Sequence, residues 1–263
     1  MFRISVIMGI YNCENTLAEA LDSLINQTFQ DFKVILCDDG SKDSSLKIAL
    51  KYKGKYPEKF IVIENTMNMG LNYTLNRCLE YADTEYVARM DGDDISLSDR
   101  FKKEIEFLDN NPDIAIVSSP MIYFDEEGEF KRGGVKNYYP DKNDFIHGTP
   151  FCHATCMVRK KAYNAVGGYS VDNRLLRVED YHLWFKMYAK GYRGYVMAEP
   201  LYMMRDDRNA VARRTWQNRL NEMYVRGIGY KMLGIPWYKR FFKYRPIIVG
   251  LLPKFIYNRL HSK

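Results

Sequence analysis

The chain has 263 residues, of which 46% are hydrophobic and 27% charged, and its formal net charge is +6. These values are typical of one globular α/β domain with some additional elements. We see no secretory signal segment at the N-terminus. Five scattered cysteines indicate reduced cytosolic thiols, which argues against a disulfide framework or a zinc site.

The charge is distributed unevenly along the chain. Residues 209–263 contain twelve Lys or Arg and one acid, a net charge of +11, whereas residues 1–208 carry −5. We therefore expect an acidic body over residues 1–208 and a basic extension over residues 209–263. Such an asymmetry suggests a polyanionic partner, either a membrane or a nucleic acid.

Short apolar runs alternate with segments of helical periodicity. We expect strands over 4–10, 32–37, 60–64 and 86–90, with helices over 15–27, 44–53 and 71–82 between them. A helix over 98–111, strands over 114–118, 121–124 and 155–158, a helix over 178–189 and short strands over 195–198 and 201–204 follow. Strands that alternate with helices at this spacing predict an α/β fold with a Rossmann-like, mostly parallel sheet, followed here by basic helices.

Polar side chains follow each of the first four predicted strands. They are Tyr11 and Asn12, then Asp39, then Asn68, then Asp91 and Asp93. The carboxyl ends of parallel strands meet at one edge of a sheet, which is where open α/β sheets bind ligands. The sequence therefore predicts a site at this edge.

The fourth strand ends in three acids around one glycine, in the order Asp91, Gly92, Asp93 and Asp94. Mg²⁺ or Mn²⁺ relieves the repulsion of such acids, because these cations prefer carboxylate oxygens and accept phosphates as further ligands. An acidic turn that caps the next helix explains the pattern equally well. We expect Gly92 to adopt a turn conformation that other residues resist and to leave space for a ligand's phosphates.

Six motifs together resemble the family 2 glycosyltransferases of GT-A fold. They are Ser5–Asn12, Gln27–Phe29, Asp38–Asp43, Asn68–Gly70, Ala88–Asp94 and Glu179–Asp180. Their order and spacing are those of the family, and the resemblance covers residues 3–205. It implies a nucleotide-sugar donor, usually a UDP-sugar, a divalent metal, and inversion at the anomeric carbon.

The resemblance assigns donor-binding roles to residues at the predicted edge. They are Ile10, Tyr11, Asn12, Asp39, Asn68, Arg89, Asp91 and Gly92. Tyr11 would stack on the uracil ring, and Asp39 would accept a hydrogen bond from the base. For Asp39 taken by itself, a turn-forming role is the simpler explanation.

The resemblance assigns metal binding to the acids that match the family motif. Asp93 is expected to ligate Mn²⁺ or Mg²⁺ directly, and Asp91 to contact the ribose or a metal-bound water. Relatives often carry a histidine two residues after an arginine near the metal. Here the stretch reads Arg205-Asp206-Asp207, so Asp207 is a further candidate ligand.

Asp180 is the expected general base, and Glu179 is expected to orient the site or bind the acceptor. The alternative is that both acids only favour the start of a helix electrostatically. His153 would face the acceptor or the phosphates, or be a structural histidine. The processive-synthase signature Gln-x-x-Arg-Trp is absent, which favours transfer of a single sugar.

The basic extension interleaves aromatic and cationic residues over 237–245. We expect it to lie on an anionic membrane surface, which fits a lipid-linked or glycan acceptor at the inner membrane face and a peripheral, cytoplasmic enzyme. The alternative is a helical bundle that packs on the core or on a second copy of the chain as a homodimer. The apolar run 247–252 is far shorter than the roughly 20 residues that a spanning helix needs.

Two other functions compete with a glycosyltransferase. A sugar-phosphate nucleotidyltransferase would share the nucleotide site and the metal but needs no base at Asp180. A non-enzymatic protein could bind nucleic acid or another polyanion through the basic extension. We favour the enzyme and expect no nucleic-acid partner. A dinucleotide dehydrogenase is disfavoured, because no G-x-G-x-x-G follows the first strand.

Overall fold

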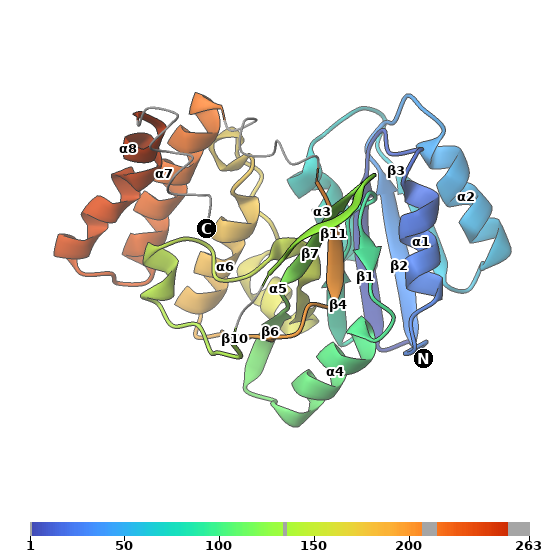
Figure 1. The fold of residues 1–263 in the computed structure, drawn as a ribbon, viewed down its shortest axis with the longest axis horizontal. Helices are drawn as coiled ribbons and strands as arrows, with labels where there is room; N and C mark the ends of the chain where they lie inside the picture. The colour runs from blue at the N-terminus through green and yellow to red at the C-terminus, as the bar shows by residue number, and fades with distance from the viewer. Residues whose placement is uncertain (1, 134–135, 207–214, 252–263) are drawn as a thin grey trace.

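A computed structural model describes residues 2–133, 136–206 and 215–251 (Figure 1). Its centre is a seven-stranded sheet in the order β10-β6-β9-β4-β1-β2-β3. The strands are β1 (Ile4–Ile10), β2 (Phe32–Asp38), β3 (Phe60–Glu64), β4 (Tyr86–Arg89), β6 (Ile114–Ser118), β9 (Met157–Arg159) and β10 (Arg193–Val196). Only β9 runs antiparallel to its neighbours in this sheet, so the predicted mostly parallel α/β sheet is confirmed.

Helices cover both faces of the sheet. One face is covered by α1 (Leu17–Ile25), α2 (Ser45–Lys55) and α4 (Arg100–Asn110), and the other by α3 (Leu71–Tyr81), α5 (Lys160–Val166) and α6 (Glu179–Ala189). Neighbouring residues of β1 serve opposite faces: Val6 and Met8 join the core under α1, and Ile7 joins the core under α3. This two-sided burial explains why the strand is apolar at almost every position.

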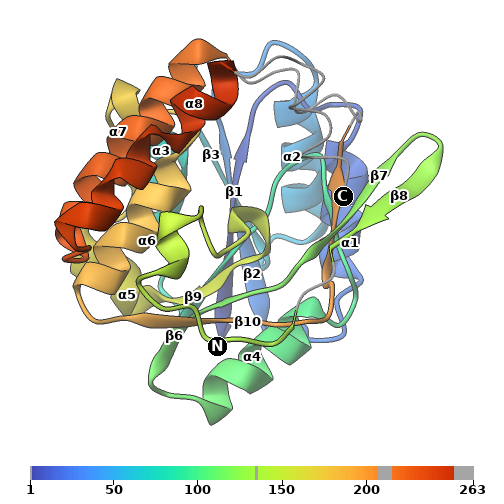
Figure 2. The same cartoon turned by 60° about the vertical axis from the view of Figure 1, so that its left-hand side comes forward.

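A second, four-stranded sheet lies beside the first, in the order β5-β11-β7-β8. It consists of β5 (Ile95–Ser96), β7 (Met121–Asp125), β8 (Gly128–Arg132) and β11 (Tyr202–Arg205). The hairpin β7–β8 projects from the body (Figure 2). Residues 121–124, predicted as a strand, lie in β7, which pairs with β11 and β8 and not with the main sheet.

The C-terminal extension begins with a helix that belongs to the core. α7 (Trp216–Met232) packs on α6 so closely that a Cβ on Gly229 would lie 2.2 Å from the Phe185 ring. Val225 and Tyr230 are fully buried in the cluster that includes α6. A 3₁₀ helix, Trp237–Tyr244, and α8 (Arg245–Leu251) follow.

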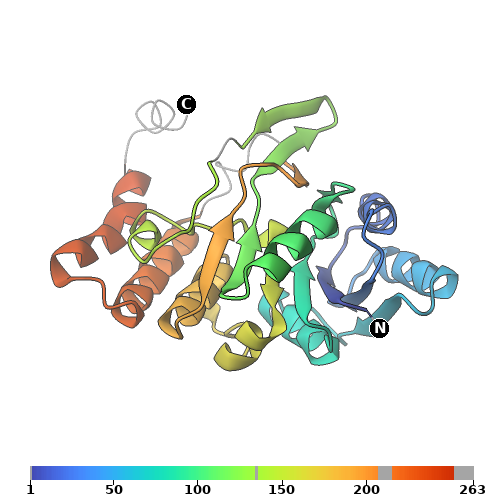
Figure 3. The same ribbon diagram turned by 90° about the horizontal axis from the view of Figure 1, so that it is seen from below.

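These C-terminal helices lie at the opposite end of the molecule from α1 and α2 (Figures 1 and 3). Within the described ranges, no helix combines the length and apolarity needed to cross a membrane.

Candidate active site

A cavity of about 450 Å³ opens at the carboxyl edge of β1 and β2. Four of the predicted donor positions line it, namely Ile10, Tyr11, Asp39 and Asn68. Glu179, from the first turn of α6, lines the same cavity. The fold thus brings residues from widely separated parts of the chain to one cavity. This cavity lies at the sheet edge where the sequence predicts a site.

The Asp39 carboxylate organises the floor of this cavity. One oxygen accepts hydrogen bonds from the side-chain amide of Asn65 at 2.7 Å and the backbone N–H of Met69 at 2.8 Å. The other accepts the N–H of Gly70 at 2.9 Å. A carboxylate offers about four acceptor positions, so these three hydrogen bonds leave one unused.

Asn12 does not line the cavity. Its side-chain oxygen accepts the backbone N–H of Lys42 at 2.8 Å, and its own N–H donates to the Ser41 hydroxyl at 3.1 Å. Its backbone has φ of 48°, in the left-handed region that Asn tolerates better than most residues. Asn12 therefore joins the loops after β1 and β2 and shapes the cavity from outside.

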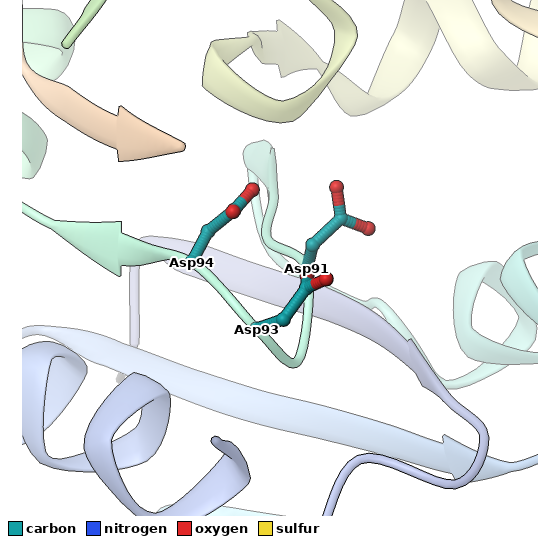
Figure 4. A group of neighbouring side chains, drawn as sticks. All are labelled: Asp91, Asp93 and Asp94. Carbon is teal, nitrogen blue, oxygen red and sulfur yellow. The ribbon is translucent and has the colours of Figure 1, made fainter. Parts of the chain in front are cut away.

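The three acids after β4 form one cluster. One carboxylate oxygen from each of Asp91, Asp93 and Asp94 lies within 4.8 Å of the others. Figure 4 shows that they arise from one short loop, with the Asp91 and Asp94 carboxylates pointing to the same side. β11 supports this loop: the Arg205 backbone N–H donates to Asp94 at 2.8 Å, and the Asp91 N–H donates to the Tyr202 hydroxyl at 3.2 Å.

Ionisation of this cluster is costly without a counter-charge. Burial raises the pKa of Asp94 to about 8, with further contributions from the charges of Asp91 and Asp93. Burial and the charge of Asp91 also raise the pKa of Asp93. A set of converging oxygen donors whose ionised forms repel is suited to a hard divalent cation, so these residues fit Mg²⁺ or Mn²⁺.

Gly92 is required for a reason that differs from the predicted one. Its φ lies outside the left-handed region, so the expected special turn conformation is wrong. A Cβ at this position would lie 2.9 Å from the Cys13 sulfur and 3.4 Å from Ile10. The space that a Cβ of Gly92 would occupy is therefore filled by the loop after β1.

Arg89 lies at the end of β4 and forms a two-pronged ion pair with Asp91 through both terminal nitrogens. It is 5% exposed, and its Nε has no hydrogen-bond partner. Its charge lowers the pKa of Glu179 and of Asp180, in each case against the larger opposite effect of burial. This buried cation thus couples the acid cluster to the start of α6.

Asp180 and Glu179 occupy the first turn of α6. Burial and the neighbouring charge of Glu179 raise the pKa of Asp180 to about 7, while the Tyr181 N–H opposes the shift. Burial also raises the pKa of Glu179. A carboxylate whose pKa lies near neutrality is poised to accept a proton and release it again.

His153 Nε2 lies 2.7 Å from the Tyr169 hydroxyl, which lies 3.3 Å from the Tyr163 hydroxyl. Burial, reinforced by the charge of Arg89, holds the pKa of His153 well below its usual value. A neutral, hydrogen-bonded histidine behind the site fits the structural alternative. Asp207, the further candidate ligand, lies outside the described residues.

The cavity wall also contains residues that were not predicted, among them Leu176, Arg177 and Asn218. Leu176 and Arg177 precede α6, and Asn218 comes from α7 in the basic extension. Arg177 has φ of 68°. Nothing in the sequence marks this conformation, because the usual signal for it is a glycine.

Comparison with known proteins identifies relatives of this chain. The family described as Glycosyl transferase family 2 matches residues 5–167. A Bacillus subtilis protein named EpsE, described as a glycosyltransferase, is 37% identical over 261 residues, which are 99% of this chain and 94% of that protein. An Escherichia coli UDP-Gal:α-D-GlcNAc-diphosphoundecaprenol β-1,3-galactosyltransferase is 33% identical over 81% of this chain and 77% of its own length.

Solved structures share the fold. S. aureus TarS 1–349 in complex with UDP-GlcNAc has a TM-score of 0.70 at 20% identity, over 88% of this chain and 70% of that one. A mannosyltransferase from Pyrobaculum calidifontis with GDP-Man and Mn²⁺ has a TM-score of 0.59 at 18% identity, over 96% of this chain and 76% of that one. The chain belongs to the family 2 glycosyltransferases. It is therefore a glycosyltransferase of GT-A fold, and not a nucleotidyltransferase or a polyanion-binding protein without enzymatic activity.

Proposed function

We propose that this enzyme transfers one sugar from a UDP-sugar, with inversion, to a hydroxyl of a lipid-linked or glycan acceptor. The observation that carries the proposal is the single cavity in which Tyr11, Asp39 and Asn68 meet Glu179. Tyr11 is 46% exposed at its rim and offers a flat ring to a base. The open acceptor position of Asp39 is available for a ring N–H.

The acids after β4 would hold Mg²⁺ or Mn²⁺, with Asp93 as the direct ligand and Asp91 shared with Arg89. When bound, the cation supplies positive charge beside the departing diphosphate. Asp93 is the most exposed of the three acids and so the freest to take a ligand. The Mn²⁺ in the mannosyltransferase complex supports a divalent ion in this fold but does not select between the two metals.

The chemical step needs a base on the acceptor side. The acceptor oxygen forms a bond to the anomeric carbon while the bond from that carbon to the diphosphate oxygen breaks, and the nucleoside diphosphate leaves with the electron pair. The acceptor's hydroxyl proton passes to the Asp180 carboxylate. Attack from the face opposite the leaving group inverts the anomeric centre. A positioned base contributes roughly 10²–10⁴-fold to such a rate.

The acceptor assignment draws on relatives. The E. coli galactosyltransferase and a 27% identical E. coli glucosyltransferase, WfaP, both act by name on GlcNAc-diphosphoundecaprenol. A 31% identical relative in Erwinia amylovora is named for amylovoran biosynthesis. A diphosphate-linked glycan lipid is therefore the acceptor class that we propose, in surface polysaccharide synthesis.

An anionic membrane surface is the proposed partner of the C-terminal helices. We call the relevant surface the aromatic–basic face: Trp237, Tyr238, Phe241, Tyr244, Ile248 and Leu251, with Lys239, Arg240, Lys243 and Arg245. Trp237 is 81% and Phe241 59% exposed. In the described part of the chain, no carboxylate pairs with the four cations, so their charge is available to anionic lipid.

The test of the proposed reaction is a product analysis. The enzyme is incubated with Mn²⁺, a panel of UDP-sugars and a short-chain GlcNAc-diphosphate lipid. We expect UDP as the released nucleotide and a new linkage whose anomeric configuration is opposite to that of the donor, as read by NMR. Retained configuration would contradict inversion and the role of Asp180, and turnover of GDP-sugars alone would contradict the donor assignment.

A further inference from the structure

Arg177 has an unusual place in the cavity wall. It lines the cavity together with Glu179, two residues ahead of that acid. Its φ of 68° lies in the left-handed region, which a side chain other than Gly, Asn or Asp rarely adopts. Backbone outliers of this kind are retained where the surroundings fix them, often at ligand-binding positions.

The surroundings here are supplied by α7. The side-chain amide of Asn221, which is 2% exposed, donates to the carbonyl of Leu176 at 3.1 Å. Asn218, one turn earlier on α7, lines the cavity next to this segment. The C-terminal extension thus fixes the backbone that presents Arg177 to the cavity.

Among the described residues, the guanidinium of Arg177 has no hydrogen-bond or ion-pair partner. Its neighbour Arg174 pairs with Asp172 at 2.7 Å and stacks over Tyr224 at 4.5 Å, and Arg89 pairs with Asp91. In residues 2–133, 136–206 and 215–251, no carboxylate forms an ion pair with Arg177. Its charge does act on the cavity, since it helps to lower the pKa of Glu179 against the larger effect of burial.

We propose that Arg177 binds a phosphate group of the acceptor and so selects acceptors that carry phosphate beside the accepting sugar. Guanidinium is the side-chain group best matched to phosphate, through charge-assisted and often paired hydrogen bonds. Arg177 stands on the same segment as the proposed base, and the base must face the acceptor. The donor's diphosphate would have its counter-charge in the divalent cation that the acids after β4 are proposed to hold. The inference rests on the proposed function and deepens it.

The experiment compares two acceptors in the full-length enzyme with Mn²⁺ and the preferred UDP-sugar. One is a GlcNAc α-diphosphate with a short alkyl chain, and the other is the uncharged α-glycoside of GlcNAc with the same chain. We expect Arg177→Gly to lower kcat/KM for the diphosphate by about tenfold or more, and to lower kcat/KM for the uncharged glycoside by much less. The Kd of UDP should also stay unchanged.

Arg177→Gly is chosen because glycine adopts a φ of 68° freely, so the variant should fold with an unchanged or higher Tm. Arg177→Lys should retain part of the preference for the diphosphate acceptor, because lysine keeps the positive charge but lacks the paired N–H donors of the guanidinium. Arg174→Gln is the matched control: it removes a nearby exposed arginine that does not line the cavity, and it should leave the preference unchanged.

Equal losses with both acceptors in Arg177→Gly would overturn the inference, as would an unchanged preference. A weaker Kd for UDP would assign the guanidinium to the donor and overturn it too. Each of these results can be distinguished from a failure of the proposed function. If the wild-type enzyme transfers sugar to neither acceptor, the function itself fails, whereas wild-type transfer with a preference that Arg177→Gly does not alter removes only the role of Arg177.

Discussion

Asp180 combines two properties that oppose each other. It sits where a carboxylate can serve as a base, in the first turn of α6, yet burial and Glu179 disfavour its ionised form. The charge of Arg89, at the end of β4, favours the ionised form of Asp180 and so offsets part of this effect. The result is a pKa of about 7, which suits proton transfer near neutral pH at the expense of stability.

This balance predicts opposite effects on rate and stability. The folded-state pKa of Asp180 is raised from 3.8 to about 7, so its stabilising contribution is present below pH 3.8 and is lost as the pH rises to about 7. Asp180→Asn mimics the protonated acid and should raise Tm above pH 7 while leaving it unchanged near pH 4. The wild-type kcat/KM should rise with pH and level off above about 7, because kcat/KM reports the pKa of the free enzyme. Thermal unfolding and pH–rate profiles check both, and a Tm below wild type at pH 8 would contradict the assignment.

Sequence reasoning located the acids but not their surroundings. Asp91, Asp93 and Asp94 are adjacent in the chain, so their convergence follows from a short loop alone. The support from Tyr202 does not, because β11 lies more than a hundred residues away. Gly92 was singled out for its backbone freedom, whereas the structure requires it for its lack of a Cβ against Cys13.

At the level of elements, the local hydrophobic pattern was enough to predict the bounds of a strand when that strand is a buried apolar run. The bounds of β1, β3 and β6 match those predicted, because each is a continuous apolar run between polar loops. The antiparallel course of β9 and the separate sheet that contains β5 were not predictable. Both depend on pairing with strands distant in sequence, which a local pattern does not encode.

Two glycines of α7 should respond in opposite ways to substitution by alanine. A Cβ at Gly229 would meet the Phe185 ring at 2.2 Å, so Gly229→Ala should cost about 1–3 kcal/mol of stability by overpacking. A Cβ at Gly227 would meet only Lys243 Cδ at 3.7 Å. Gly227→Ala should therefore stabilise the protein by up to about 1 kcal/mol through helix propensity.

Denaturant unfolding of the two variants tests how α7 is docked. Both changes add one methyl group to the same helix. The gain in helix propensity is therefore the same in the two variants and cancels when their stabilities are compared. Stability changes of the same sign, or a neutral Gly229→Ala, would mean that α7 does not pack on α6 as described.

For the whole molecule, the charge asymmetry would orient the enzyme on the anionic surface that we propose as its partner. The +11 extension places cations and exposed aromatics on the aromatic–basic face, and the acidic body carries −5. Because α7 is part of the core and lines the cavity through Asn218, contact of this face with lipid would hold the cavity near a lipid-linked acceptor. Each basic residue near an anionic surface contributes on the order of 1 kcal/mol.

Vesicle flotation tests this orientation. The wild-type protein should float with vesicles containing 30% phosphatidylserine and not with neutral vesicles, and flotation should weaken with salt. Trp237→Ser with Phe241→Ser should reduce flotation strongly. Leu50→Ser, an exposed apolar residue on α2 at the other end of the molecule, should not. No flotation, together with a dimer mass by light scattering that the double variant abolishes, would assign the face to a second copy of the chain instead.

The central claim is that the base at the start of α6 and the acids after β4 act on one donor–acceptor pair. Its most direct test is the turnover of Asp180→Asn, with the Kd of the UDP-sugar measured on the same sample. We predict that turnover falls by roughly 10²–10⁴-fold while the donor Kd stays close to wild type. Turnover near that of wild type in the folded variant would contradict the account.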